Sequence, residues 1–111
     1  LKQEKKYGIS ILSKTMHDVD NETTIILENG EYNNFIVHKT GHGLGLDVHE
    51  DPYIVRGNNS PLEIGMVITV EPGLYLPGKF GIRIEDDVVI TDKDPNVLTS
   101  FSKDLRIINN E

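Results

Sequence analysis

The spacing of glycine and proline beyond residue 30 is the feature that most constrains the fold of this chain. Apolar runs of strand length alternate there with turn sequences such as Ser60–Gly65 and Leu76-Pro77-Gly78, and Pro72-Gly73 interrupts one of the runs. Glycine adopts turn conformations easily, and proline lacks a donor for the sheet ladder. We therefore expect short strands at hairpin spacing. The expected strands are Phe35–Val37, Met66–Glu71 and Gly81–Thr91, with short edges at Leu98-Thr99 and Arg106–Ile108.

A helical pattern precedes these strands. Thr15 and Asp18 have the spacing of a capping box, with Asp in place of the usual Glu or Gln. The pattern predicts a helix over Met16–Asn29, ended by Gly30 in the left-handed conformation. The expected inward stripe consists of Val19, Thr23, Ile26 and Leu27. One main helix packed on a mostly antiparallel, curved sheet is an α+β fold.

Composition excludes several classes of protein. The chain has 111 residues, enough for one domain, and a net charge of -7 with 11 scattered Lys and Arg, which argues against nucleic acid as a partner. No apolar run approaches the roughly 20 residues needed to span a membrane. Leu1–Ser10 is polar and does not resemble a signal peptide, and there is no Cys. These features predict a cytoplasmic protein without a membrane partner.

Two glutamates and a histidine stand out from the apolar pattern. Glu71 ends the apolar run Val67–Val70, and Glu85 interrupts the expected strand Gly81–Thr91. Carboxylates at such positions are costly unless a cation compensates them. His42 lies within a glycine-rich run, and His38 and His49 lie on either side of it. Carboxylate and imidazole ligands together suit Mn, Co, Zn or Fe.

Each of these residues also has an ordinary explanation. A histidine in a loop is usually solvated, and Arg83 beside Glu85 fits a surface ion pair worth about 0–1 kcal/mol. Asp86 and Asp87 fit a solvated strand face better than a ligand set. The glycines of the run have a functional interpretation as well, since they allow the backbone to approach a bound ion or substrate closely. The argument for chemistry therefore depends on the combination.

That combination resembles a known family. The segments His38–Glu50, Gly65–Tyr75 and Gly81–Asp86 are similar, in order and separation, to the motifs of the creatinase/methionine aminopeptidase superfamily, whose fold is called pita-bread. The resemblance covers about residues 10 to 108. The wording of the first and third segments is most similar to Xaa-Pro aminopeptidase and prolidase.

The resemblance implies roles for individual residues. His42, Glu71 and Glu85 match metal ligands, with Glu85 bridging two ions. His38, His49, Glu71 and Arg83 match residues that take part in catalysis. The residues that match substrate contacts are His38, His49, Tyr75 and Arg56.

The resemblance also implies a larger parent enzyme. In this family two aspartates on a preceding hairpin complete the site, and nothing before His38 resembles that hairpin. Residues 1–111 are therefore expected to be a partial catalytic domain, inactive alone. The parent is expected to be a homodimer that uses two divalent ions, with Mn first and Co or Zn as alternatives, to hydrolyse Xaa-Pro bonds of peptides or dipeptides. The alternative is a non-catalytic relative that binds proteins through the same fold.

Overall fold

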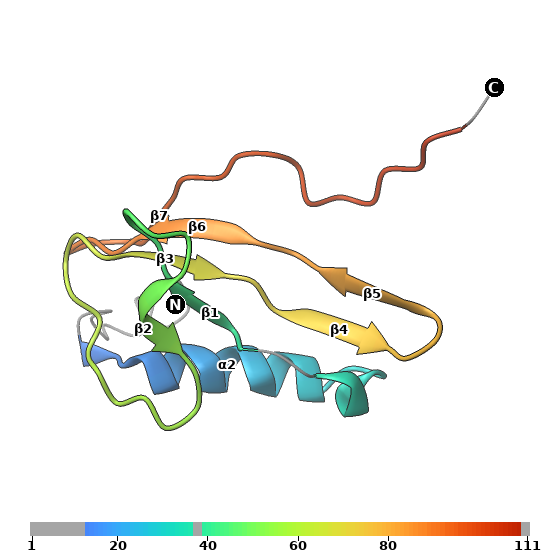
Figure 1. The fold of residues 1–111 in the computed structure, drawn as a ribbon, viewed down its shortest axis with the longest axis horizontal. Helices are drawn as coiled ribbons and strands as arrows, with labels where there is room; N and C mark the ends of the chain where they lie inside the picture. The colour runs from blue at the N-terminus through green and yellow to red at the C-terminus, as the bar shows by residue number, and fades with distance from the viewer. Residues whose placement is uncertain (1–12, 37–38, 110–111) are drawn as a thin grey trace.

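The computed structural model describes residues 13–36 and 39–109 and has one long helix and seven strands in these ranges (Figure 1). The helix α2 spans Met16–Glu28, and a 3-10 turn, η2, follows at Asn33–Phe35. The strands are β1 Gly41–Gly43, β2 Glu50–Ile54, β3 Val67–Val70, β4 Gly73–Leu76, β5 Phe80–Arg83, β6 Asp86–Val89 and β7 Asn96–Val97. The predicted α+β class is confirmed.

The capping box predicted at the start of α2 is present. The Asp18 amide donates to the Thr15 hydroxyl at 3.2 Å, and the Thr15 amide donates to the Asp18 carboxylate at 2.9 Å. That backbone hydrogen bond lowers the pKa of Asp18, with a smaller contribution from the Thr15 hydroxyl. The first turn also docks on the loop before β3, because the Met16 amide donates to the Ser60 carbonyl at 3.0 Å.

The buried face of α2 differs from the predicted stripe. Met16, Val19 and Asp20 are buried, and Thr23 and Leu27 are half-buried. The fully buried residues of α2 therefore lie in its N-terminal half. Ile26 is 71% exposed, and its assignment to the stripe was wrong. The helix axis extends past β1 and β2 toward the β4–β5 hairpin, so its last turns have less of the core above them (Figure 1).

The end of α2 also differs from the prediction. Gly30 does not have a positive φ, and the helix ends through Asn29 in a right-handed conformation. The Gly30 amide donates to the Leu27 carbonyl at 3.1 Å, which tightens the last turn into 3-10 geometry. Among the described residues, the glycines with positive φ are instead Gly57, Gly65 and Gly78, all in loops between strands.

The strands form a five-stranded sheet in the order β2-β1-β3-β6-β7 and a separate two-stranded sheet, β4-β5, and every pairing is antiparallel. The expected strand Gly81–Thr91 is divided into β5 and β6 at Ile84-Glu85. The register nevertheless continues across the division, because β3 and β6 pair Val70 with Asp86, and β4 and β5 pair Gly73 with Arg83. The two sheets therefore follow one another along a single long hairpin (Figure 1).

The hydrophobic core lies between α2 and the five-stranded sheet. Its buried members come from the helix, from three strands and from the flanking loops, and Met66 and Val70 pack against them. They are Met16, Val19, Ile54, Leu62, Ile68, Val88 and Ile90. None of the helices in the described ranges is long and apolar enough to cross a membrane.

Three of the predicted short strands need correction. Phe35 belongs to η2 and Ile36 forms only an isolated bridge with Leu74, while Val37 lies outside the described residues. The edge expected at Leu98-Thr99 lies earlier, at β7. Residues 106–108 form no strand, and the segment after β7 runs away from the sheet (Figure 1).

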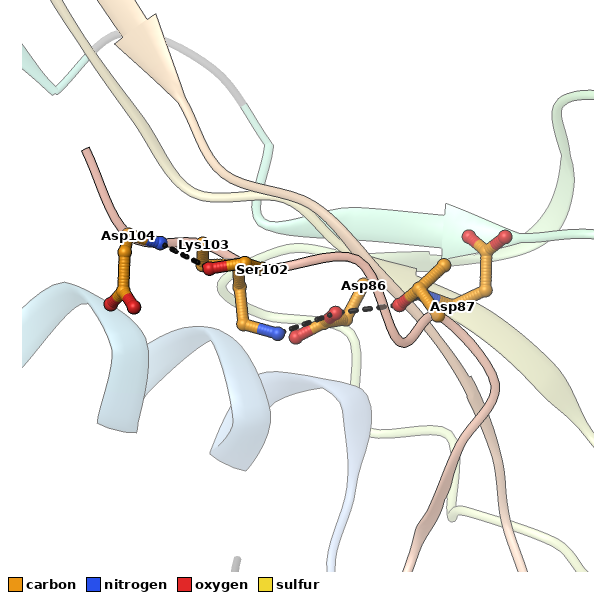
Figure 2. A network of polar contacts seen from close by, with 6 residues as sticks. Asp86, Asp87, Ser102, Lys103 and Asp104 are labelled. Carbon is orange, nitrogen blue, oxygen red and sulfur yellow. Dashed lines mark hydrogen bonds and ion pairs between the residues drawn. The ribbon is translucent and has the colours of Figure 1, made fainter. Parts of the chain in front are cut away.

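Asp86 holds the beginning of that segment. Its carboxylate accepts from the Thr99 hydroxyl and from Lys103 at 3.1 Å, and the Asp87 amide donates to the Thr99 hydroxyl at 3.3 Å (Figure 2). The Thr99 hydrogen bond is the main reason that the pKa of Asp86 is lowered. Asp86 is therefore a structural acceptor and not the solvated residue that its position in the sequence indicated.

We expect Thr15→Ala to lower the free energy of unfolding by about 1 kcal/mol, because an N-terminal amide of α2 loses its acceptor. Urea denaturation followed by circular dichroism measures this change. Glu22→Ala, at an exposed position of the same helix, is the control and should change stability by less than about 0.5 kcal/mol. An unchanged midpoint for Thr15→Ala would show that the capping box does not stabilise the chain.

Candidate metal centre

Two carboxylates face one another at the division of the long hairpin. The register that pairs Val70 with Asp86 places Glu71 opposite Glu85, and residues directly opposite in an antiparallel pair point to the same face. The hydrogen-bond ladder between the two strands is interrupted here because Pro72 has no amide hydrogen to donate. The Pro72 carbonyl still accepts from the Ile84 amide at 3.3 Å. Like charges directly opposite one another are destabilising, so this arrangement favours a proton or a cation between them.

The pKa of Glu85 is raised above its ordinary value of 4.5. Partial burial of the carboxyl group is the largest cause, followed by the charge of Glu71 and a side-chain hydrogen bond to it; the Arg83 charge acts in the opposite direction. A hydrogen bond between two carboxyl groups requires a shared proton. The rise in the pKa of Glu85 therefore favours a proton as compensation where no cation is bound.

His42 adds an imidazole to the two carboxylates. It lies on β1, is 8% exposed, and its Nε2 is 3.3 Å from Glu71 Oε2. Its Nδ1 is 2.8 Å from the Gly43 carbonyl, which has no proton to donate, so Nδ1 is the donor. The Nδ1 hydrogen bond consequently turns Nε2 toward the Glu71 carboxylate. Metal-bound histidines typically have their other ring N–H donated to a carbonyl or carboxylate in this way.

The glycines of β1 allow the neighbouring strands to pack closely. A Cβ at Gly41 would lie 2.8 Å from the carbonyl carbon of Thr69, and one at Gly43 would lie 2.8 Å from that of Asp51. These contacts give the glycines a structural role, and close approach of the backbone to an ion or substrate stays a prediction. They allow β1 to lie close to β3 and β2, which brings His42 next to Glu71.

Thr69 fixes the depth of His42 in this packing. Its hydroxyl accepts from the His42 amide at 3.1 Å, and Thr69 itself is 2% exposed. The hydroxyl therefore takes the place of a carbonyl in the β1–β3 ladder. Sequence reasoning missed Thr69 because a threonine in a buried strand is common and gives no pattern of its own.

Arg83 and His49 complete the surroundings. Arg83 Nη1 is 3.7 Å from Glu71 Oε1, so Arg83 pairs across the hairpin, whereas the ordinary explanation from the sequence paired it with Glu85. The ring of His49 lies 4.5 Å from that of His42, centroid to centroid, on the bend between β1 and β2. Both groups can donate hydrogen bonds to a negatively charged group held beside Glu71.

These side chains open onto two cavities. A cavity of about 740 Å³ is lined by Ile36, Lys39, Gly41, His42, His49, Tyr53, Glu71 and Arg83. A smaller one, of about 330 Å³, is lined by His42, Leu44, Val48, His49, Thr69, Glu71, Arg83, Glu85 and Asp87. All three proposed ligands thus line the smaller cavity.

The other predicted residues lie elsewhere or outside the described ranges. His38 lies outside them. Tyr75 is on β4 and its ring lies against Gly81, and Arg56 follows β2; neither is on the wall of the two cavities. Sequence reasoning missed Lys39 and Tyr53, although Tyr53 pairs with His42 across β1 and β2. The Lys39 ammonium lies 4.4 Å from the centroid of the Tyr53 ring.

The donor set fits a divalent ion in its chemistry but is not preformed. Within residues 13–36 and 39–109, no three His, Cys, Asp or Glu side chains are arranged to hold a metal ion. The arrangement is pairwise: His42 Nε2 lies 3.3 Å from Glu71 Oε2, and the strand register places Glu71 opposite Glu85. An imidazole and two opposed carboxylates are nevertheless groups that a cation would satisfy together.

Comparison with known proteins agrees with this chemistry. The profile of Metallopeptidase family M24 matches residues 7–92. An uncharacterized peptidase of Staphylococcus epidermidis is 45% identical over 89 residues, which is 80% of this chain and 25% of that protein. An Xaa-Pro dipeptidase of Lactobacillus helveticus is 43% identical over 94 residues, 85% of this chain and 26% of that protein.

A solved structure, the Xaa-Pro dipeptidase from Bacillus anthracis, superposes with a TM-score of 0.81 at 40% identity, over 85% of this chain and 26% of that one. The chain therefore spans about a quarter of the length of the relatives that it matches. The match in structure supports the predicted relation to the pita-bread enzymes.

We expect Glu85→Gln to stabilise the metal-free chain at pH 7. Folding raises the pKa of Glu85, so its favourable contribution is complete below pH 4.5 and is lost as the pH rises through the folded value. Gln cannot ionise and keeps a donor for Glu71 at every pH. Urea denaturation in a chelator at pH 4 and pH 7 should show an advantage of Glu85→Gln at pH 7 that disappears at pH 4.

Glu63→Gln, at an exposed position in the turn before β3, is the matched control and should behave like the wild type at both pH values. An advantage of Glu85→Gln that is equal at pH 4 and pH 7 would contradict the shared proton.

Proposed function

The chain belongs to Metallopeptidase family M24, and from this premise we propose that it forms the metal-binding, C-terminal part of a peptidase that hydrolyses the bond between an N-terminal residue and proline. The observation that carries the proposal is the convergence of His42 Nε2 with Glu71, which faces Glu85 across the hairpin. The names of two relatives, Xaa-Pro dipeptidases of L. helveticus and B. anthracis, support the choice of substrate.

We propose His42, Glu71 and Glu85 as the residues of this chain that hold divalent ions, with Mn as the first expectation and Co or Zn as alternatives. Bound divalent ions lower the pKa of water toward neutrality and polarise a carbonyl group. The remaining ligands would come from an aspartate pair in the preceding part of a longer protein. With only part of the ligand set, residues 1–111 alone are expected to bind metal weakly and to be inactive.

The chain's own residues have distinct tasks in this proposal. Glu71 accepts a proton from the attacking water and delivers it to the leaving proline nitrogen. Arg83, 3.7 Å from Glu71, orients that carboxylate. His49 donates a hydrogen bond to the oxygen of the scissile carbonyl as negative charge develops there. His38, Tyr75 and Arg56 remain proposed substrate contacts.

An apolar groove supports the idea that the rest of a catalytic domain packs on this chain. The groove has a volume of about 330 Å³ and lies between the end of α2 and the β4–β5 hairpin. Its lining is almost entirely apolar and consists of Leu27, Tyr32, Pro72, Gly73, Leu74, Leu76, Phe80, Ile82 and Ile84. Phe80 and Ile82 are more than half exposed, and burial of these side chains under a covering segment would be favourable.

We further propose that the parent enzyme is a homodimer and is cytoplasmic.

We expect the longer protein that contains this chain to hydrolyse an Xaa-Pro dipeptide with Mn²⁺ and to lose about 10²–10⁴-fold in kcat on Glu71→Gln, because general acid–base catalysis contributes this much. Glu63→Gln serves as the control and should retain full activity. Hydrolysis that survives complete removal of metal would contradict the proposal. Absence of hydrolysis together with stable capture of a protein partner would favour the non-catalytic binding module.

A further inference from the structure

Thr40 connects three parts of the fold immediately before His42. Its amide donates to the Ile54 carbonyl of β2 at 3.2 Å, and its carbonyl accepts from the Glu71 amide at 2.7 Å. Its hydroxyl donates to the Asp20 carboxylate of α2 at 2.7 Å. We propose that the buried pair Asp20–Thr40 is a positioning pair that sets the separation of His42 from Glu71. This inference rests on the metal site of the proposed function.

Burial makes the pair a strong constraint. Asp20 is 8% exposed and Thr40 is 4% exposed, and the Thr40 hydroxyl is the donor to the carboxylate. A hydrogen bond to a charged acceptor is stronger than one between neutral groups, and an unpaired carboxylate at this depth is costly. Movement of Thr40 away from α2 would leave Asp20 without this donor. The helix therefore fixes Thr40 at the entrance to β1.

Thr40 is linked to both proposed ligands by short backbone connections. His42 is two residues further along β1, and its amide is held by the Thr69 hydroxyl. Glu71 is held by its own amide on the Thr40 carbonyl. A shift of Thr40 by a few tenths of an ångström would be transmitted to the 3.3 Å approach of His42 Nε2 to Glu71 Oε2. Loss of a group that orients a metal ligand directly typically weakens metal binding about 10–100-fold, and we expect loss of the Asp20–Thr40 pair to act in the same direction through the backbone.

The test uses this chain and Mn²⁺, whose paramagnetism broadens nearby resonances even when binding is weak. Titration with Mn²⁺ is followed on the His42 ring protons in the wild type and in variants at the pair. Thr40→Val removes the hydroxyl and keeps the shape of the side chain, and we expect it to weaken Mn²⁺ binding tenfold or more. Thr40→Ser restores the hydroxyl and should bind within about threefold of the wild type.

Two further variants separate positioning from general stability. Thr23→Val removes a hydroxyl of the same helix that donates to the Val19 carbonyl within α2, so it should leave Mn²⁺ binding unchanged. Asp20→Ala should weaken binding as Thr40→Val does, and the double variant should lose no more than either single one, because both remove the same interaction.

A metal-free measurement tests the pair independently of the proposed function, because it does not require residues 1–111 to bind Mn²⁺. We expect the Glu71 and His42 amides to exchange with solvent at least tenfold faster in Thr40→Val than in wild type and Thr40→Ser, while Thr23→Val leaves them unchanged. Equal exchange rates and equal Mn²⁺ affinity in folded Thr40→Val would overturn the inference. So would an equal effect of Thr23→Val.

Discussion

The opposition of Glu71 and Glu85 is the constraint on which the rest of the site depends. One register runs through the whole hairpin, from Val67 opposite Val89 to Leu76 opposite Phe80, so the two carboxylates cannot avoid one another by a local slip. A slip by one residue would turn every side chain of the strands to the other face and expose Ile68 and Val88. The core therefore holds the two acids together, and a proton or cation between them has to offset their repulsion.

The glycines of β1 and the hydroxyl of Thr69 solve a second problem, which is how an imidazole reaches the carboxylates from a neighbouring strand. Side chains at Gly41 or Gly43 would separate β1 from its neighbours, as the short distances to Thr69 and Asp51 show. Close packing of the strands alone would still allow His42 to shift along the strand direction relative to β3. The hydrogen bond from its amide to Thr69, together with the one from Nδ1 to the Gly43 carbonyl, fixes both its depth and the direction of Nε2.

The sequence predicted local features better than the contacts between distant residues. The capping box at Thr15 and the unusual positions of Glu71 and Glu85 depend on neighbours in the chain, and each could be found from spacing alone. The exposure of Ile26 depends on how far the sheet extends above the helix, and the partner of Arg83 depends on the register of the hairpin. Asp20 and Thr40 are 20 residues apart and belong to no motif, so only the packed structure could join them.

The magnitude of the Arg83 interaction explains how Glu71 can be oriented and still remain available as a ligand. Arg83 is 50% exposed in its side chain and lies 3.7 Å from Glu71, so the pair is worth only about 0–1 kcal/mol. A buried pair of the same kind would hold the carboxylate too firmly to be shared with a cation. The stronger constraints act on the backbone instead, through the Thr40 carbonyl and the Thr69 hydroxyl. The fold thus fixes the backbone positions of His42 and Glu71. The charge of the Glu71 carboxylate is left to be compensated by a bound cation.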